Sequence, residues 1–442
     1  MPRTGARIVI TGYGSLGDLS PLITLGVGLR ERGHTVVVAT ADPFREHVER
    51  AGLQFHPMRP HLLPDEMLSL AMTPDGSMEI LFRDVLFPSI RESYDDLLAA
   101  ALSADVLISH MLAFAAPLVA AATGLPWISV VLQPLGFLSP NDRIVTFSDQ
   151  TPSGLEELDA TTSRDAWRQG RRMSQGWGEP IRRLRAALGL PPGLHPVYED
   201  HHSPGLVLGL FSKLLAAPQH QPAAARITGF LFDERGKGRL PQTLELFLAR
   251  GEPPVIVTLG SHTPFDNFGF HVSGALAALS MGRRVVLLGQ GTGVHADVVK
   301  SLNPVWADSI RAYDFVPYSL VFPQAAAVIH HGGVGTIGAC LQAGTPMLLV
   351  PMGFDQLHNS WQAARIGSVG LLAAPSFSVA TATQQLLALL HDPSRAEVAA
   401  RMSAVVREED GLRSACRRVE SYWRRAASGD RRAGHAMWIG GS

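Results

Sequence analysis

A glycine-rich turn near the N-terminus carries the first group that could do chemistry. Gly12, Gly14 and Gly17 follow a short apolar run at the spacing G-x-G-x-x-G, and Asp18 comes directly after them. This spacing is typical of turns that place the pyrophosphate of a dinucleotide at a helix N-terminus. A carboxylate there would repel a diphosphate, however, and interact favourably with the helix dipole. We therefore expect Asp18 to cap the helix, a role that is compatible with that of a catalytic base at the end of the first strand.

A second glycine-rich turn, far along the chain, offers more chemistry. It follows an apolar strand that ends in two histidines and precedes a helical pattern. Glycines let the backbone approach a ligand closely, and the exposed N–H groups of a helix start suit a phosphate. An imidazole and a hydroxyl beside them can bind the same phosphate oxygens. The residues concerned are His331, Gly332, Gly333, Gly335 and Thr336.

Asp355 and Gln356 follow the next strand and place a carboxylate and an amide where the hydroxyls of a sugar could be bound. A zinc site is a poor interpretation, because His330 and His331 are adjacent and point to opposite sides of an extended strand, with no matching cluster after them. A serine hydrolase would need G-x-S-x-G at this turn, and that motif is absent.

The elements that position these residues alternate between short apolar strands and helical patterns, which is typical of parallel βαβ units. The apolar runs are continuous, so both faces of each sheet should be covered. The sequence therefore predicts the α/β fold class, with two doubly wound domains. The predicted strands are 7–12, 34–40, 105–110, 127–133 and 206–211 in the first half, and 254–260, 283–289, 326–332, 346–351 and 369–374 in the second.

Composition limits the classes of function. The chain has 442 residues, 46% of them hydrophobic and 17% charged, with a formal net charge of −1. These values favour a soluble protein of two domains with no basic surface for nucleic acid. Two cysteines give no disulfide framework, so a cytoplasmic location is expected. The apolar stretch 111–132 is interrupted by "TGLP" and predicts a buried helix and strand instead of a membrane span. Peripheral membrane contact stays open.

The second turn and the residues after it resemble the donor-site signature of the family-1 glycosyltransferases, the nucleotide-sugar-dependent enzymes of the GT-B fold. The opening "GSLGDLSPLITLGVGLRERGHTVVVAT" and "VTLGS" are similar to the same family. Within it, "GLPWISVVLQPLGFLSPND" and "ITGFLFDE" resemble the bacterial branch that contains a rhamnolipid rhamnosyltransferase and the sterol glucosyltransferases. The signature residues are His331-Gly332-Gly333-Val334-Gly335-Thr336, Ala343-Gly344-Thr345-Pro346, Asp355-Gln356 and Asn359.

The resemblance implies a division of labour between the domains. Residues 1–215 would bind the acceptor, 216–241 would link the domains, 242–425 would bind the nucleotide sugar, and 426–442 would form a flexible tail. Within the donor site, a histidine, a threonine and a serine would contact the diphosphate, a valine would offer its backbone to the base, and a carboxylate and an amide would hold the sugar. These residues are His331, Thr336, Ser261, Val316, Asp355 and Gln356.

The resemblance also implies an inverting reaction in which Asp18 removes the proton of an acceptor hydroxyl. Ser109-His110 stand where plant members carry a carboxylate that assists the base, so an Asp18–His110 pair is one interpretation of His110, and a satisfied core histidine is the other. No D-x-D triplet occurs in the chain, so a metal-independent reaction is expected.

The donor and the acceptor are predicted only by class. Plant members place a ribose-binding Glu where this chain has Ala339, which favours a dTDP-sugar, such as that of rhamnose, over a UDP-sugar. The alternatives are a nucleotide-sugar epimerase of the same fold, a non-catalytic auxiliary protein and a Rossmann dehydrogenase. Methionines and aromatics in the irregular segments favour an apolar acceptor such as a lipid, polyketide or sterol, although core packing explains them equally well. They are Met58, Met67, Met72, Met78, Phe82, Phe87, Phe137 and Trp167.

Overall fold

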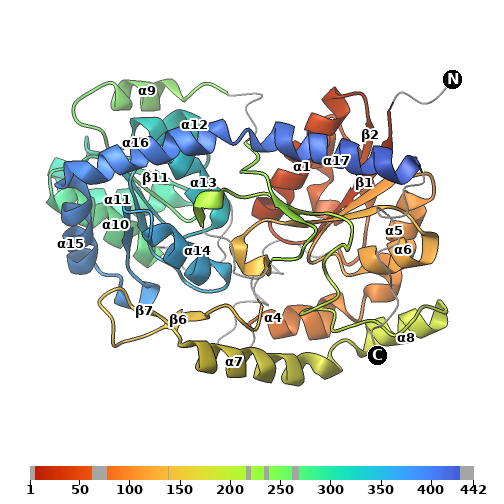
Figure 1. The fold of residues 1–442 in the computed structure, drawn as a ribbon. Helices are drawn as coiled ribbons and strands as arrows, with labels where there is room; N and C mark the ends of the chain where they lie inside the picture. Colours follow the sequence, from red (N-terminus) through yellow and green to blue (C-terminus); the bar gives the residue numbers. More distant parts are fainter. Residues whose placement is uncertain are drawn as a thin grey trace.

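Two parallel sheets lie side by side, each covered by helices, in the computed structural model (Figure 1). The colours of the N-terminal sheet run from red to light green, and those of the C-terminal sheet from green to blue. Two doubly wound α/β domains were the predicted architecture, and the structure confirms them. The residues that the structure describes are 5–61, 77–137, 139–215, 221–232, 238–260 and 268–428.

The N-terminal sheet has the strand order β3-β2-β1-β4-β5-β8-β9, and every neighbouring pair is parallel. Its strands are β1 Arg7–Thr11, β2 Thr35–Thr40, β3 Gln54–Pro57, β4 Val106–His110, β5 Trp127–Val131, β8 Val207–Gly209 and β9 Ala225–Ile227. The helices of this half are α1 Leu16–Glu31, α2 Arg45–Arg50, α4 Ser77–Ile80, α5 Ile90–Ala101, α6 Ala115–Thr123, α7 Ala160–Met173 and α8 Glu179–Ala187, with a π-helix at Leu81–Leu86.

The C-terminal sheet has the order β12-β11-β10-β13-β14-β15 and is also parallel throughout. Its strands are β10 Val255–Thr258, β11 Val285–Leu288, β12 Ile310–Tyr313, β13 Ala327–His330, β14 Met347–Leu349 and β15 Val369–Leu371. The helices are α9 Gln242–Leu248, α10 Phe268–Ser280, α11 Thr292–Leu302, α12 Tyr318–Val321, α13 Val334–Ala343, α14 Asp355–Ala364, α15 Val379–Leu390, α16 Pro393–Glu408 and α17 Gly411–Ala427.

The ten predicted strands all form, and the further strands of the two large sheets lie at their edges. β3 and β12 are partly exposed, so they lack the continuous apolar run that marks a buried strand. β9 falls inside the predicted linker, 216–241, and extends the N-terminal sheet instead. The apolar stretch 111–132 forms α6 and β5, separated by Gly124 in the left-handed conformation at φ 71°. None of the described helices has the length and apolar composition that a bilayer crossing needs.

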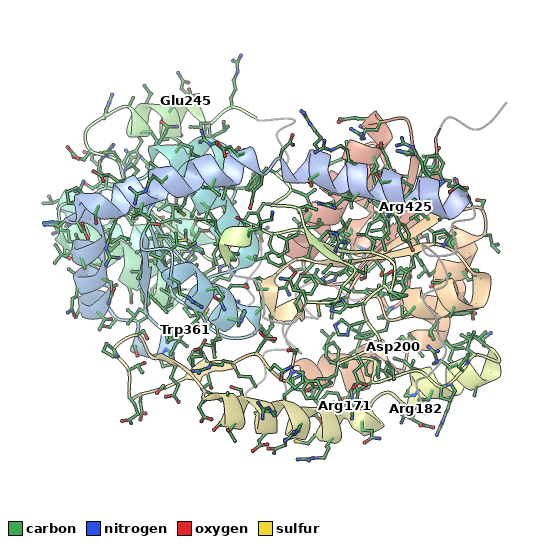
Figure 2. All side chains as sticks on the ribbon, viewed as in Figure 1. Arg171, Arg182, Asp200, Glu245, Trp361 and Arg425 are labelled. Atoms are coloured by element: carbon green, nitrogen blue, oxygen red, sulfur yellow. The ribbon has the colours of Figure 1, made fainter. Side chains whose placement is uncertain are left out.

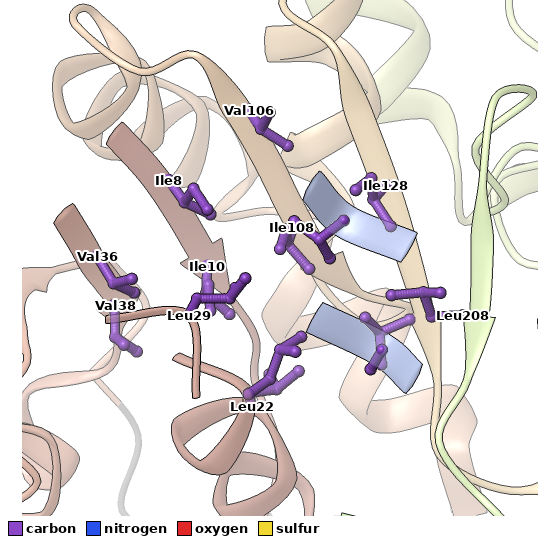
Figure 3. Packing of buried hydrophobic residues seen from close by; sticks show 14 of the residues in the cluster. Ile8, Ile10, Leu22, Leu29, Val36, Val38, Val106, Ile108, Ile128 and Leu208 are labelled. Carbon is purple, nitrogen blue, oxygen red and sulfur yellow. The ribbon is translucent and has the colours of Figure 1, made fainter. Parts of the chain in front are cut away.

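Helix α17 ends the described chain on the N-terminal domain, although its sequence falls mostly within the predicted C-terminal domain, 242–425. It follows α16 through Asp410 and returns across the top of the molecule (Figure 1). Its Ala415, Cys416, Val419 and Tyr422 are buried in the same apolar cluster as the strands of the N-terminal sheet. Figure 3 shows the sheet side of that cluster, with the side chains of β1, β2, β4 and β5 gathered against α1.

A hairpin of the N-terminal half makes a second connection between the domains. Strands β6 Val145–Phe147 and β7 Leu155–Glu157 pair antiparallel and lie, with α7, along the lower side of the molecule (Figure 1). The backbone N–H of Ala373 in the C-terminal domain donates to the carbonyl oxygen of Ser153 at 2.7 Å. The linker, this hairpin and α17 therefore all connect the two halves of the chain.

An ion pair between a buried carboxylate and a partly exposed arginine fixes α17 to the first βα unit. Glu420, whose side chain is 8% exposed, accepts from Arg32 Nε at 2.6 Å and Nη2 at 2.9 Å. His34 Nδ1 accepts the N–H of Ala6, so its Nε2 carries the hydrogen and lies 3.3 Å from Glu420 Oε1. The hydrogen bond from Arg32 lowers the pKa of Glu420. The stabilisation is therefore present above the usual carboxyl pKa and is lost as the pH falls through the lowered value.

We predict that Glu420→Gln lowers the free energy of unfolding by about 1–3 kcal/mol near neutral pH, because hydrogen bonds to a charged group are lost in a buried place. Asp95→Asn removes the exposed Arg91–Asp95 pair and should cost less than about 0.5 kcal/mol. Urea unfolding at several pH values measures both. The wild type and Glu420→Gln should converge at acid pH, and equal effects of the two substitutions at neutral pH would contradict the prediction.

Candidate active site

The first glycine turn joins β1 to α1 and holds Asp18 in the first turn of that helix. Ser15 is the N-cap, and its side chain accepts the N–H of Gly17 at 3.1 Å. Asp18 Oδ2 accepts from the backbone N of Ser15 at 2.8 Å and from its hydroxyl at 2.9 Å, which completes a capping box. Asp18 therefore takes part in capping this helix as predicted, but from the third helical position, because Ser15 is the N-cap itself. The second oxygen, Oδ1, accepts no hydrogen bond from the residues that the structure describes, and the side chain is half-buried.

The glycines of this turn make room for two side chains. Gly14 has φ 131°, and a Cβ on it would lie 2.4 Å from Asp18 Oδ2. A Cβ on Gly12 would lie 3.1 Å from His110 Cβ and 2.6 Å from a methyl of Leu22. The G-x-G spacing is thus explained by the close approach of Asp18 and His110 to the backbone.

His110 ends β4 on the neighbouring strand and is buried beside the first turn. Its Nδ1 lies 3.2 Å from the carbonyl oxygen of Tyr13 and donates to it, whereas Nε2 is buried with no partner among the described residues. Burial lowers the pKa of His110, and the negative charge of Asp18 acts in the opposite direction. The two residues are therefore electrostatic neighbours, although no hydrogen bond joins them in the described part of the chain.

The second glycine turn joins β13 to α13. Gly332 has φ 84°, and a Cβ on it would lie 2.1 Å from Ser360 Oγ. A Cβ on Gly333 would lie 2.4 Å from His331 Nε2, so the histidine ring lies against the turn. Gly333 is the N-cap of α13 and no side chain caps it. The first N–H groups of this helix are therefore left for a ligand.

His331 is half-buried and neutral at pH 7, because burial lowers its pKa to about 4. Its Nδ1 has no hydrogen-bond partner among the described residues. His330 points into the core, where its Nδ1 accepts the N–H of Gly332 at 3.2 Å. Within the described ranges, no group of three His, Cys, Asp or Glu side chains is placed to hold a metal ion.

Asp355 and Gln356 begin α14, after a short connection from β14 that ends in a strained residue, Phe354, at φ 55° and ψ −141°. Asp355 Oδ2 accepts from Asn359 Nδ2 at 2.6 Å, and Gln356 Oε1 accepts from the N–H of Met352 at 3.0 Å. Burial, together with the negative charge of Asp18, raises the pKa of Asp355 to about 6. Asp18 of the N-terminal turn is therefore close enough to Asp355 for its charge to act on that carboxyl group.

The other predicted donor-site residues differ in burial, and one of them lies outside the described residues. Thr336 is buried in the first turn of α13, and Gly335 beside it is exposed. The side chain of Val316 is 1% exposed inside an apolar cluster, so a contact with the base would have to come from its backbone. Ser261 lies outside the described residues. Sequence reasoning did not single out Ser360, whose buried hydroxyl has no described partner and touches the turn at Gly332.

The apolar residues predicted for an acceptor pocket mostly pack the domain instead. Met58, Phe82 and Phe87 are buried in one apolar cluster of the N-terminal half, and Phe137 is buried in another. Trp167 packs edge-on against Tyr198, with ring centroids 5.2 Å apart. Met67 and Met72 lie outside the described residues, as does the side chain of Met78.

The two parallel-sheet α/β domains have the fold of the GT-B glycosyltransferases, and comparisons with known proteins agree. Residues 8–128 match the glycosyltransferase family 28 N-terminal domain. Residues 294–410 match the C-terminal domain of proteins like erythromycin biosynthesis protein CIII. The chain belongs to this family of glycosyltransferases, as the sequence predicted.

Individual relatives extend the likeness over nearly the whole chain. O-mycaminosyltylonolide 6-deoxyallosyltransferase of Streptomyces fradiae is 31% identical over 439 residues, which cover 94% of this chain and 97% of that protein. Sterol 3-beta-glucosyltransferase of Debaryomyces hansenii is 26% identical over 444 residues, and the match covers 94% of this chain but 27% of that longer enzyme. The solved structure of the glycosyltransferase VinC in complex with dTDP has a TM-score of 0.64 at 22% identity and covers 96% of this chain and 100% of that one.

We predict that Gly332→Ala lowers the free energy of unfolding by about 1–3 kcal/mol, because the new methyl group overlaps Ser360 Oγ at a positive φ. Gly335→Ala is the matched control, since nothing lies within 4 Å of its added Cβ. It should leave stability unchanged or raise it by up to about 1 kcal/mol, as Ala favours a helix. Chemical denaturation measures the stability of both variants. Similar stabilities would contradict a steric constraint at Gly332.

Proposed function

We propose that this glycosyltransferase moves a sugar, with inversion, from a dTDP-sugar to a hydroxyl group of an apolar natural-product acceptor. One observation carries the proposal: of the buried polar side-chain atoms without described partners, four lie at the two turns or on α14 beside the second of them. Native proteins pair nearly all such atoms, so unpaired atoms at a candidate site are available to a ligand. The atoms are His110 Nε2, His331 Nδ1, Asn359 Oδ1 and Ser360 Oγ.

The donor would bind along the second turn. Its diphosphate would accept from the uncapped N–H groups at the start of α13, with Thr336 and neutral His331 as further donors. Asp355 and Gln356 would accept from the sugar hydroxyls. Ser261 stays a predicted diphosphate contact, and the backbone of Val316 stays a predicted contact of the base.

In the reaction, Asp18 Oδ1 would take the proton of the acceptor hydroxyl as that oxygen attacks the anomeric carbon. The bond between this carbon and the diphosphate oxygen breaks at the same time, and the nucleoside diphosphate leaves with the bonding electrons. Negative charge grows on the leaving oxygen, where the α13 N-terminus stabilises it without a metal ion. His110 would position or polarise the same hydroxyl through its Nε2.

The acceptor class rests on the relatives. The Streptomyces fradiae relative is named for transfer of a 6-deoxyhexose to a glycosylated tylonolide, and the fungal relative for transfer of glucose to a sterol. Likeness over the whole of the first protein favours a polyketide-type acceptor and a deoxyhexose such as rhamnose, with a sterol as the second candidate. The cytoplasmic location and the domain limits stay predictions.

Asp18→Asn should lower kcat by roughly 10²–10⁴, the usual contribution of a positioned general base, while dTDP affinity stays unchanged. Asparagine can still accept from Ser15, so the helix cap survives. Ser15→Ala is the control, because it removes the capping partner and keeps the carboxylate. Steady-state rates and thermal midpoints of both variants separate the roles. Similar losses of rate in the two variants would reduce Asp18 to a cap.

The nucleotide preference gives a separate prediction. Because Ala339 cannot accept a hydrogen bond from a ribose 2′-hydroxyl, UDP should bind more weakly than dTDP by about 1–3 kcal/mol, the cost of an unpaired buried hydroxyl. Deoxyuridine diphosphate is the control: it shares its base with UDP and its sugar with dTDP, and should bind like dTDP. Competition calorimetry measures all three. UDP binding more tightly than dTDP would overturn the preference.

A further inference from the structure

A cavity of about 390 Å³ lies between helix α17 and the far edge of the N-terminal sheet. On the sheet side it is lined by residues at β8 and β9, including Arg226. On the helix side its lining residues are Ser414, Arg417, Arg418, Ser421 and Arg425. Arg425 is labelled on α17 in Figure 2, over the N-terminal half. None of these residues belongs to the site between the glycine turns.

The helix residues recur at positions i, i+3, i+4, i+7 and i+11, which places them on one face of α17. The opposite face carries the buried residues that fix the helix to the N-terminal core. The helix is therefore held rigidly while a stripe of two hydroxyls and three guanidinium groups lines the cavity. Such preorganisation of the helix favours binding, because little backbone freedom remains to be lost.

The charged residues that line this cavity are all positive. None of the described residues that line it is Asp or Glu, whereas four are Arg. Arg226 Nη1 is held by the carbonyl oxygens of Ala223 and Ala225, at 2.9 and 2.7 Å. Arg418 Nε is buried without a hydrogen-bond partner among the described residues. A second cavity, of about 380 Å³, shares Arg226 and Arg418 and adds Lys213.

We propose that this arginine cavity binds a small anion that carries phosphate groups, of about the size of pyrophosphate or a sugar phosphate. Guanidinium groups bind phosphate oxygens in pairs, and a buried unpaired donor gains a partner when the anion enters. Like charges held together repel, so a bound polyanion also relieves that repulsion and stabilises the contact of α17 with the N-terminal domain.

The surroundings favour a small anion over a membrane surface. Membrane binding usually combines basic groups with apolar side chains that enter the bilayer. The large exposed hydrophobic residues of the described chain include Leu102, Met173, Val305 and Phe315, and none of them lines either cavity. The hollow shape and the two hydroxyls also fit a small ligand better than a flat lipid surface.

Calorimetric titration of the full chain with sodium pyrophosphate tests the proposal. The wild type should bind, and the double variant Arg418→Gln/Arg425→Gln should bind at least tenfold more weakly. Arg164→Gln/Arg172→Gln removes the same charge from exposed positions on α7 and should bind like the wild type. All titrations are made with dTDP at saturation, which occupies the proposed donor site, so pyrophosphate bound under these conditions reports on the cavity alone. Failure of dTDP to bind would contradict the proposed function and leave the test of the cavity unaffected.

Two results would overturn the proposal. One is unchanged pyrophosphate affinity in the cavity variant, shown to be folded by its thermal unfolding midpoint without ligand. The other is loss of binding in the α7 control, which would reduce the effect to net charge. Vesicles of phosphatidylcholine and phosphatidylglycerol form the second arm: co-sedimentation that the cavity variant alone abolishes would assign the arginines to a lipid headgroup instead.

Discussion

The parallel direction of every strand in both large sheets is the constraint on which the rest of this structure depends. Parallel strands need helices on both faces, so polar side chains cannot emerge from the sheet itself. They can emerge where the strands end. Asp18 follows β1, His110 ends β4, His331 follows β13 and Asp355 follows β14 shortly after its end. The candidate chemistry is thus concentrated at the carboxyl edges of the sheets, as expected for open α/β folds.

Those edges act together only if the two domains keep a defined relation, and α17 contributes to it. The helix belongs by sequence to the C-terminal half and by packing to the N-terminal core. The ion pair between Arg32 and Glu420 joins residues 388 positions apart, next to buried Cys416 and Tyr422. The hairpin contact between Ser153 and Ala373 ties the opposite side of the molecule. The domains are therefore connected on both sides of the cleft that the family implies.

The sequence was informative where local patterns decide the structure. Continuous apolar runs predicted the buried strands, and Asp18 directly after Gly17 predicted a capped helix start. Edge strands β3 and β12 were not predicted, because partly exposed strands lack such an apolar run. The position of α17 could not be predicted for another reason. Its amphipathic pattern indicates a helix but does not identify the distant surface that the helix covers. Ser360 was not predicted as a site residue for the same reason, since only the fold brings its hydroxyl against Gly332.

The candidate site combines groups of opposite electrostatic character. The start of α13 offers the partial positive charge of a helix N-terminus, with a neutral histidine beside it. Two carboxylates from different domains, Asp18 and Asp355, are close enough that the charge of the first adds to burial in raising the pKa of the second. Glycosyl transfer separates charge in the same sense, because the leaving diphosphate becomes more negative while the anomeric carbon becomes more positive. In the proposed function, donors at the diphosphate and carboxylates at the sugar would stabilise that separation more than the intact donor, and such a difference accelerates a reaction. A positive centre that formed near both carboxylates would also relieve the repulsion by which Asp18 contributes to the raised pKa of Asp355.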